Sequence, residues 1–305
     1  MTVLRTIGLT KKFGDFAALN GVNIEVGEGE VYGFIGPNGS GKSTTLRILL
    51  GILKATEGRA EIFGKDSWKD AVEIHKRVAY VPGDVNLWPN LTGGEVIDLF
   101  IKLRGGGNLD RRQELIRKFD LDPTKKCRTY SKGNRQKVAL IAALSSDVDL
   151  YILDEPTSGL DPLMERVFQE YVIEAKKQGK SILLSSHILS EVEKLCDKVA
   201  IIREGRIIET GTLKELRHLT GTILLVETRE PIPALEGFKG VSGIQQKGQA
   251  LSFQVDAGEV DQVIRYVSQF GVIRIESSPP TLEELFMRHY EGTGQAVESG
   301  AGGES

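Results

Sequence analysis

A glycine-rich octapeptide, Gly36-Pro37-Asn38-Gly39-Ser40-Gly41-Lys42-Ser43, restricts the possible fold of this chain more than any other segment. It follows a mostly apolar run, Glu30 to Ile35, and precedes a run with helical periodicity, Ser43 to Leu53. The spacing G-x-x-x-x-G-K-S between a strand and a helix is that of a phosphate-binding P-loop. Glycines let the backbone curl until successive N–H groups point at one anion, and the following helix adds its positive end. This context argues against the alternative, a flexible glycine turn that binds nothing.

A second element of the same site is Leu150-Tyr151-Ile152-Leu153-Asp154-Glu155, an apolar strand that ends in two carboxylates. Alone, an acidic pair after a strand is more often a helix cap. With a P-loop upstream, Lys42 is expected to reach the β- and γ-phosphates and the Ser43 hydroxyl to bind Mg²⁺. Asp154 is then expected to hold Mg²⁺ through water, and Glu155 to polarise the attacking water. The two elements together predict nucleotide hydrolysis.

Composition excludes several other classes of protein. The net charge of −3 gives no electrostatic reason to expect nucleic-acid binding. No apolar run approaches the roughly 20 residues of a membrane-spanning helix, and Met1 to Gly14 lacks the apolar core of a signal peptide. The two cysteines, Cys127 and Cys196, are too few for a disulfide framework or a zinc site and are interpreted as packed residues. We therefore expect a cytosolic protein.

Most of the chain alternates between strand and helix patterns. Two antiparallel strands are expected at Val3 to Leu9 and Leu19 to Val26, with a turn at Gly14 and Asp15. Continuous apolar strands separated by helices imply a parallel sheet that is covered on both faces. The further strands are Gly58 to Phe63, Val78 to Val81, Leu150 to Leu153 and Lys180 to Ser185; the helical stretches are Thr92 to Leu144, broken at Gly105 to Gly107 and at Asp122-Pro123, and Pro162 to Lys177.

The pattern changes near Thr210 to Thr220. Beyond it we expect a small α/β unit, whose strands are Thr222 to Glu227, Leu251 to Val255 and Val272 to Glu276 and whose helices are Val260 to Gln269 and Leu282 to His289. The predicted division is therefore 1–218 (with a helical subdomain at about 84–148), 219–290 and 291–305. The last segment is expected to be a disordered tail, because Gly, Ser, Ala and Glu have almost nothing to bury.

The order of the remaining motifs resembles one superfamily, the ABC ATPases. Ser158-Gly159-Leu160-Asp161 looks like the family's D-loop, and Tyr130-Ser131-Lys132-Gly133-Asn134 takes the place of its signature motif. His187 stands where the switch histidine belongs, and Phe13 where an aromatic ring stacks on adenine. Singly, Phe13 is more often a core residue, His187 a helix-start residue and Ser131 a helix N-cap. Their common order over residues 2–215 overturns these alternatives.

The resemblance implies an ABC-type P-loop NTPase fold: a parallel core sheet, antiparallel N-terminal strands and a helical subdomain, followed here by the small α/β domain. It implies ATP and Mg²⁺ as cofactors, with Glu155 and His187 as catalytic residues. The residues that it assigns to ATP are Phe13, Pro37, Asn38, Gly39, Ser40, Gly41, Lys42, Ser43 and Thr44; those that act from the opposite subunit are Ser131, Lys132, Gly133 and Asn134, with Ser158 and Asp161 in the D-loop.

Two positions depart from the family pattern. Lys132 replaces the first glycine of the usual Leu-Ser-Gly-Gly-Gln signature, and Asn134 replaces its glutamine. Tyr-Ser-Lys-Gly looks like the variant of the signature motif that is seen in many bacterial export ATPases. The family also places a metal-sensing glutamine where this chain has Gly83, which has no side chain for that purpose. Asp84 is the candidate to coordinate the metal or its water instead.

The resemblance also implies partners. In this family each ATP is sandwiched between two subunits, so we expect a homodimer or a pair of similar paralogues. A motor without membrane helices needs a separate membrane permease, which would hold it at the inner face of the membrane. Trp88, between Asp84 and Gly107, either contacts that permease or packs under a loop. The C-terminal unit resembles an accessory domain of bacterial drug and antibiotic exporters.

Two alternatives remain open at this point. One is a soluble ABC-type ATPase that acts on nucleic acid or ribosomes, although such proteins usually carry tandem ATPase halves, coiled-coil insertions or basic arms. The other is a nucleotide-binding regulator with little turnover, suggested by Gly83. Glu155 and His187 argue against the second alternative, and the transported compound is not encoded in a motor subunit.

Overall fold

The computed structural model describes residues 1–106, 108–218, 221–233, 235–248, 250–256 and 258–278. It divides into two units, Met1–Thr210 and a second that begins at Gly211. The predicted helix Leu282 to His289 and the predicted tail 291–305 lie outside the described residues.

A six-stranded sheet forms the centre of the first unit, in the order β11-β10-β4-β9-β8-β7. Its five strands from β10 to β7 run parallel. Because both faces are covered, β4, β8 and β9 are buried along their whole length, as their continuous apolar sequences predict. The bounds are β4 Val31–Ile35, β7 Val78–Val81, β8 Leu150–Asp154, β9 Ser181–Ser186, β10 Lys198–Arg203 and β11 Arg206–Thr212. The strands β10 and β11 were not predicted from the sequence.

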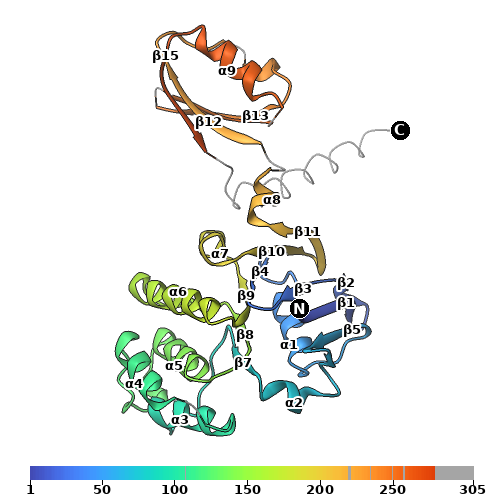
Figure 1. Ribbon diagram of the computed structural model, residues 1–305, viewed down its shortest axis with the longest axis vertical. Coiled ribbons are helices and arrows are strands. Elements are labelled where there is room, and N and C mark those ends of the chain that lie inside the picture. The colour runs from blue at the N-terminus through green and yellow to red at the C-terminus, as the bar shows by residue number, and fades with distance from the viewer. Residues whose placement is uncertain (107, 219–220, 234, 249, 257, 279–305) are drawn as a thin grey trace, which may run out of the picture. The chain divides into compact units, whose positions relative to one another are not determined.

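The strand β4 lies between two layers of the first unit (Figure 1), and successive side chains of a strand point to opposite faces of its sheet. Tyr32 and Phe34 join the core shared with α1 (Lys42–Leu49) and with an antiparallel sheet. Gly33 faces α7 (Leu189–Leu195), where a Cβ would lie 2.6 Å from the Val192 side chain. The helix α6 (Pro162–Lys177) contacts β9 and α7. The antiparallel sheet comprises β1 Thr2–Phe13, β2 Phe16–Val22, β3 Glu25–Gly27, β5 Glu57–Ile62 and β6 Lys65–Asp66.

Two predicted elements of this region have different bounds in the structure. The expected strand Leu19 to Val26 is divided into β2 and β3, because the Thr6 hydroxyl donates to the Val22 carbonyl (2.9 Å) and accepts from the Ile24 N–H (3.0 Å). The helix expected to reach Leu53 ends at Leu49. Gly51, at φ +64°, has the left-handed conformation that commonly ends a helix.

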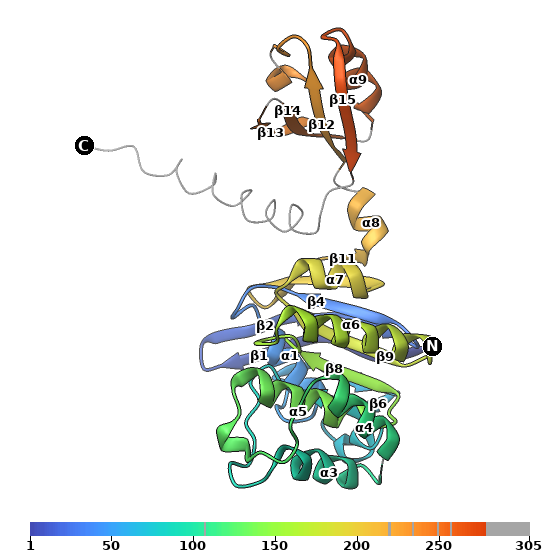
Figure 2. The same cartoon turned by 90° about the vertical axis from the view of Figure 1, so that its left-hand side faces the viewer.

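The predicted helical stretch contains three α-helices, which lie beside β8 in Figure 2. Thr92 and Glu95 form a capping box at the first, and Asn108 and Ser131 cap the other two. The chain breaks at Gly105 and Gly106, as predicted, while residue 107 lies outside the described residues. The bounds of these three helices are α3 Gly93–Leu103, α4 Leu109–Lys118 and α5 Lys132–Leu144. Two short helices lie nearby in the sequence, α2 Ala71–His75 and the 3-10 helix η1 Cys127–Thr129. Cys127 and Cys196 are buried and free, as expected.

The second unit is built on a four-stranded sheet in the order β13-β14-β12-β15. One core joins this sheet to α9, with Leu224, Phe253, Val255 and Val263 at its centre. The polar strand β13 was not predicted, since its apolar periodicity is weak. The bounds are α8 Leu213–His218, β12 Thr222–Thr228, η2 Leu235–Gly237, β13 Val241–Lys247, β14 Ala250–Val255, α9 Val260–Ser268 and β15 Val272–Ser278.

Candidate nucleotide-binding site

The glycine loop lies between β4 and α1, as the sequence predicts. Two of its glycines are required by their surroundings. A Cβ on Gly36 would lie 2.4 Å from the Ile202 carbonyl oxygen. Gly41 has φ +112°, and a Cβ there would lie 2.6 Å from the Leu19 side chain. The loop can therefore hold its curled shape only with glycine at these positions.

The Lys42 side chain lies inside this loop and is only 5% exposed. Its Nζ donates to the carbonyl oxygens of Gly36 (2.6 Å) and Pro37 (3.1 Å) and lies 3.6 Å from Glu155 Oε1. Burial lowers the pKa of Lys42, and the nearby carboxylates of Glu155 and Asp154 oppose this effect. The loop's own carbonyl oxygens therefore hold the Lys42 ammonium group beside Glu155.

The acidic pair lies at the end of β8, beside the end of β9. The Ser185 hydroxyl of β9 donates to Asp154 Oδ1 at 2.5 Å. Glu155 has φ +44°, an uncommon conformation for a residue with a Cβ that often marks functional sites. Its Oε2 lies 3.2 Å from His187 Nδ1. The Glu155 carboxylate thus lies between Lys42 and His187, and the structure brings these three predicted residues together.

The residues present fit a nucleotide phosphate and its metal ion. Ser40 Oγ is buried in the loop and has no hydrogen-bond partner among the described residues. No group of three His, Cys, Asp or Glu side chains in the described part of the chain could hold a metal by itself. Mg²⁺ commonly binds through one or two protein ligands and the phosphates of its nucleotide. Ser43 and Asp154 are of the right chemical type for that role.

Gly83 lies against Asp154. A Cβ there would lie 3.4 Å from the Asp154 carbonyl oxygen and 3.7 Å from its Oδ2. The position of the missing glutamine therefore faces the predicted metal-binding carboxylate. Asp84 is exposed and makes no hydrogen bond or ion pair with the described residues.

The remaining predicted residues lie at the ends of strands and helices or in loops. Phe13 ends β1 and is 52% exposed, which excludes the alternative that it is a core residue. Ser131 caps α5, where its hydroxyl accepts from the Asn134 N–H (3.2 Å). Asp161 caps α6 and accepts from the Met164 N–H (3.0 Å). Trp88 is 51% exposed, and its ring centroid is 6.1 Å from that of Phe100.

Some residues around this site were not predicted. Ser185 contacts Asp154, Gln136 donates to the Pro156 carbonyl, and Glu191 accepts from Thr157. Serine, glutamine and glutamate are common residues without a distinctive spacing, so only the tertiary contacts identify them.

Comparisons with known proteins agree with this geometry. The sequence model of the ABC transporter family matches residues 19–158, and that of the DrrA1-3-like C-terminal domain matches residues 211–290. The bacitracin transport ATP-binding protein BcrA of Bacillus licheniformis is 32% identical over 94% of this chain and 97% of its own length. The chain belongs to the ABC transporter ATP-binding proteins. Another member, the daunorubicin resistance ATP-binding protein DrrA3 of Streptomyces coeruleorubidus, is 32% identical over 98% of this chain and 99% of its own.

Solved structures of ABC ATP-binding proteins share the fold. The ATP-binding subunit of an ABC transporter superposes with a TM-score of 0.67 at 32% identity, over 71% of this chain and 92% of that one. A dimeric ATP-binding cassette in a post-hydrolysis state, bound to ADP and Pi, gives a TM-score of 0.63 at 26% identity, over 69% of this chain and 98% of that one. The predicted fold class, ATP binding and ATPase activity of this ABC protein are confirmed. None of its helices within the described residues has the length and apolarity needed to cross a membrane.

Proposed function

We propose that this ABC ATPase is the motor of a membrane exporter of the drug or antibiotic type. Two ATP-binding subunits close around ATP and drive a separate permease from the cytoplasmic face of the membrane. The observation that carries the proposal is the similarity over nearly the whole chain, C-terminal domain included, to proteins named for bacitracin transport and daunorubicin resistance.

In this proposal different residues of the chain have different roles in hydrolysis. The P-loop N–H groups and Lys42 would bind the β- and γ-phosphates. Ser43, together with Asp154 acting through water, would hold Mg²⁺, which would neutralise phosphate charge. Glu155 orients and polarises the attacking water. His187, 3.2 Å from Glu155, contacts the γ-phosphate and keeps that carboxylate in place. Catalysis is then mainly positioning and electrostatic stabilisation.

Dimerisation follows from where the signature residues lie. Ser131 and Lys132 are exposed at the start of α5 and are free to meet a second subunit. A lone subunit leaves the γ-phosphate without the signature part of its cage, so its hydrolysis is slow. Two subunits that share two ATP molecules complete both sites.

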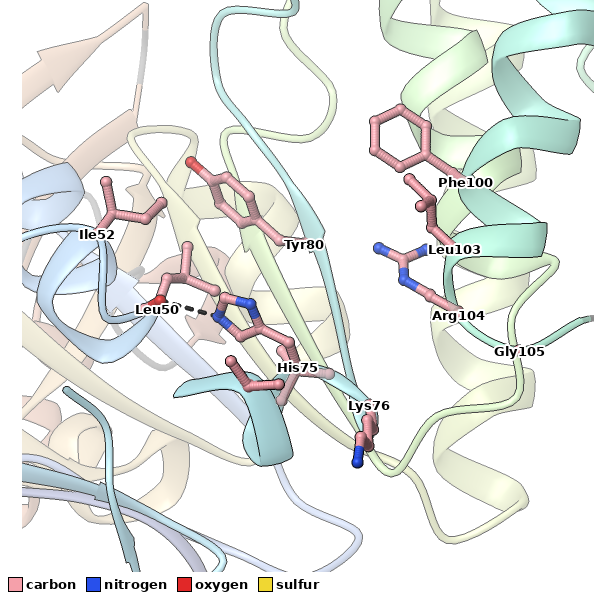
Figure 3. Close-up of a pocket in the computed structure, with 11 residues that line it drawn as sticks. Leu50, Ile52, His75, Lys76, Tyr80, Phe100, Leu103, Arg104 and Gly105 are labelled. Atoms are coloured by element: carbon pink, nitrogen blue, oxygen red, sulfur yellow. Dashed lines mark hydrogen bonds between the residues drawn. The ribbon is translucent and has the colours of Figure 1, made fainter. Parts of the chain in front are cut away.

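A groove of about 660 Å³ within the first unit supports a permease partner. Figure 3 shows Phe100, Leu103 and Arg104 on one wall, with Tyr80 and His75 on the other. Its rim exposes large apolar side chains: Leu103 is 72% exposed, and Ile52 and Val72 are also exposed. Such a rim fits a short apolar segment of another protein.

The charged side chains of the groove indicate which charge a bound permease segment would carry. Among its described lining residues the titratable side chains are His75, Lys76, Arg104 and Tyr80, with no carboxylate. Arg104 donates to the Ala142 carbonyl (3.3 Å) and to Ser146 Oγ (3.1 Å), both neutral groups. Burial lowers the pKa of Arg104, and no ion pair joins its guanidinium group to a carboxylate of the described residues. A permease segment with one Asp or Glu would supply that partner.

The test is purification of the tagged chain from detergent-solubilised membranes of its host. An integral membrane protein with several spanning helices should co-purify with the wild type and be lost with Leu103→Glu. Leu109→Glu is the matched control, because Leu109 is 67% exposed but does not line the groove. Both variants should keep the ATPase activity of the isolated chain. Retention of the membrane protein by Leu103→Glu would contradict the groove as its docking site, whereas co-purification of RNA or ribosomes alone would contradict the proposed function.

A further inference from the structure

The buried carboxyl of Glu191 joins two catalytic loops. Glu191 lies on α7 and is 4% exposed. Its Oε2 accepts from the Ser186 hydroxyl (2.9 Å) and from the Thr157 hydroxyl (3.4 Å). Its Oε1 is buried and has no hydrogen bond with the described residues. A buried carboxyl held only by two hydroxyl groups is costly, which points to a role other than stability.

One of these hydroxyl groups fixes the loop that carries His187. Ser186 precedes His187, and its Oγ also accepts from the Ile188 N–H at 2.9 Å. The Ser186 side chain therefore links the backbone on both sides of His187 to Glu191. The His187 ring itself is half exposed, and its Nδ1 lies 3.2 Å from Glu155 Oε2.

The other hydroxyl group belongs to the segment Pro156–Gly159, which overlaps the start of the predicted D-loop Ser158–Asp161 and which we call the D-loop segment. Its opposite side is held by α5, the helix that begins with the signature residues. Gln136 Nε2 donates to the Pro156 carbonyl (2.9 Å), and Lys132 Nζ donates to Ser158 Oγ (2.8 Å). A Cβ on Gly133 would lie 2.4 Å from the Gly159 carbonyl oxygen. The D-loop segment is thus held between Glu191 and the signature helix.

We propose that Glu191 is a positioning residue for ATP hydrolysis, because its carboxyl holds the His187 loop and the D-loop segment at a fixed separation. His187 in one site and the signature helix that serves the neighbouring site then move together. The inference rests on the proposed catalytic role of His187. It explains why Lys132, where the family has glycine, is useful here: its ammonium group ties the signature to Ser158.

The electrostatic setting agrees with this geometry. Burial raises the pKa of Glu191 to about 7, while the hydroxyl groups of Ser186 and Thr157 lower it. The carboxylates of Glu165 and Glu155 raise it further. Glu191 is therefore an acceptor for two hydroxyl groups rather than half of an ion pair.

The test compares Glu191→Ala, Glu191→Gln and Ser186→Ala, with Glu170→Ala as the control on an exposed face of α6. Glu191→Ala should lower kcat about tenfold while the KM for ATP changes less than about twofold, because the loss affects transition-state geometry rather than binding. Glu191→Gln retains an acceptor oxygen and should restore kcat to within about threefold of the wild type. Ser186→Ala should lower kcat as well, and it decides the question if Glu191→Ala fails to fold.

The double variant Glu191→Ala/His187→Ala separates this inference from the proposed function. It should be no slower than His187→Ala alone, since both changes remove the same interaction. If His187→Ala keeps the wild-type kcat, the proposed role of His187 fails. If His187→Ala is inactive but Glu191→Ala and Ser186→Ala keep the wild-type kcat, the positioning role of Glu191 is overturned. Equal losses for Glu191→Ala and Glu191→Gln would also overturn it.

Discussion

Replacing Glu191 with glutamine should change how the stability of the first unit depends on pH. Burial raises the pKa of the carboxyl from 4.5 to about 7 in the folded protein. Between these values the folded state keeps a proton that the unfolded state has released, so unfolding becomes easier as the pH rises. The stabilising contribution of the protonated carboxyl is complete below the unfolded pKa of 4.5 and is lost as the pH rises through about 7.

The size of the effect follows from the same two pKa values. A rise of the pKa from 4.5 to about 7, at about 1.4 kcal/mol for each pKa unit, corresponds to about 3 kcal/mol of unfolding free energy. Glutamine does not titrate, so Glu191→Gln lacks this loss. From pH 5 to pH 8 the wild type should therefore lose up to about 3 kcal/mol of unfolding free energy relative to Glu191→Gln. Any constant cost of the buried amide cancels from the comparison.

Urea unfolding followed by tryptophan fluorescence measures this difference. Both tryptophans, Trp68 and Trp88, belong to the Met1–Thr210 unit, so the signal reports on that unit alone. Glu170→Gln, on the exposed face of α6, should follow the wild type at every pH. A wild-type minus Glu191→Gln difference that stays constant from pH 5 to pH 8, or that moves in the opposite direction, would refute the argument.

Two further outcomes are expected at the nucleotide site. Glu155→Gln removes the carboxylate that polarises water but keeps its shape, so ATP should trap a closed dimer. A monomer in light scattering with ATP present would contradict the proposed ATP-driven dimerisation. Gly36→Ala places a Cβ 2.4 Å from the Ile202 carbonyl oxygen and should weaken ATP binding at least about tenfold in a fluorescent-nucleotide titration, because the cradle must open. Gly237→Ala, with no atom within 4 Å of its Cβ, is the control and should bind ATP normally.

Much of the site could be predicted from short contiguous segments. The P-loop spacing and the acidic end of an apolar strand are local patterns, and the structure has them between β4 and α1 and at the end of β8. Helix starts were equally local, since Ser131 caps α5 through its own neighbour Asn134. Strands with weak or interrupted patterns were missed or merged. The polar β13 is one example, and the division at Thr6 between β2 and β3 is another, because it depends on a side chain in a different strand.

The sequence alone determined which chemical groups this protein carries for ATP and in which local backbone setting each one lies. Only the tertiary structure decided that they meet. The sheet order β4-β9-β8 brings the ends of three parallel strands together, and with them Lys42, His187 and Glu155. The contacts of Glu191 with Ser186 and Thr157 depend on the same order, and Gly83 lies beside Asp154 because β7 pairs with β8. Turn and strand preferences are properties of neighbouring residues, whereas strand order results from packing over the whole core, which no single segment encodes.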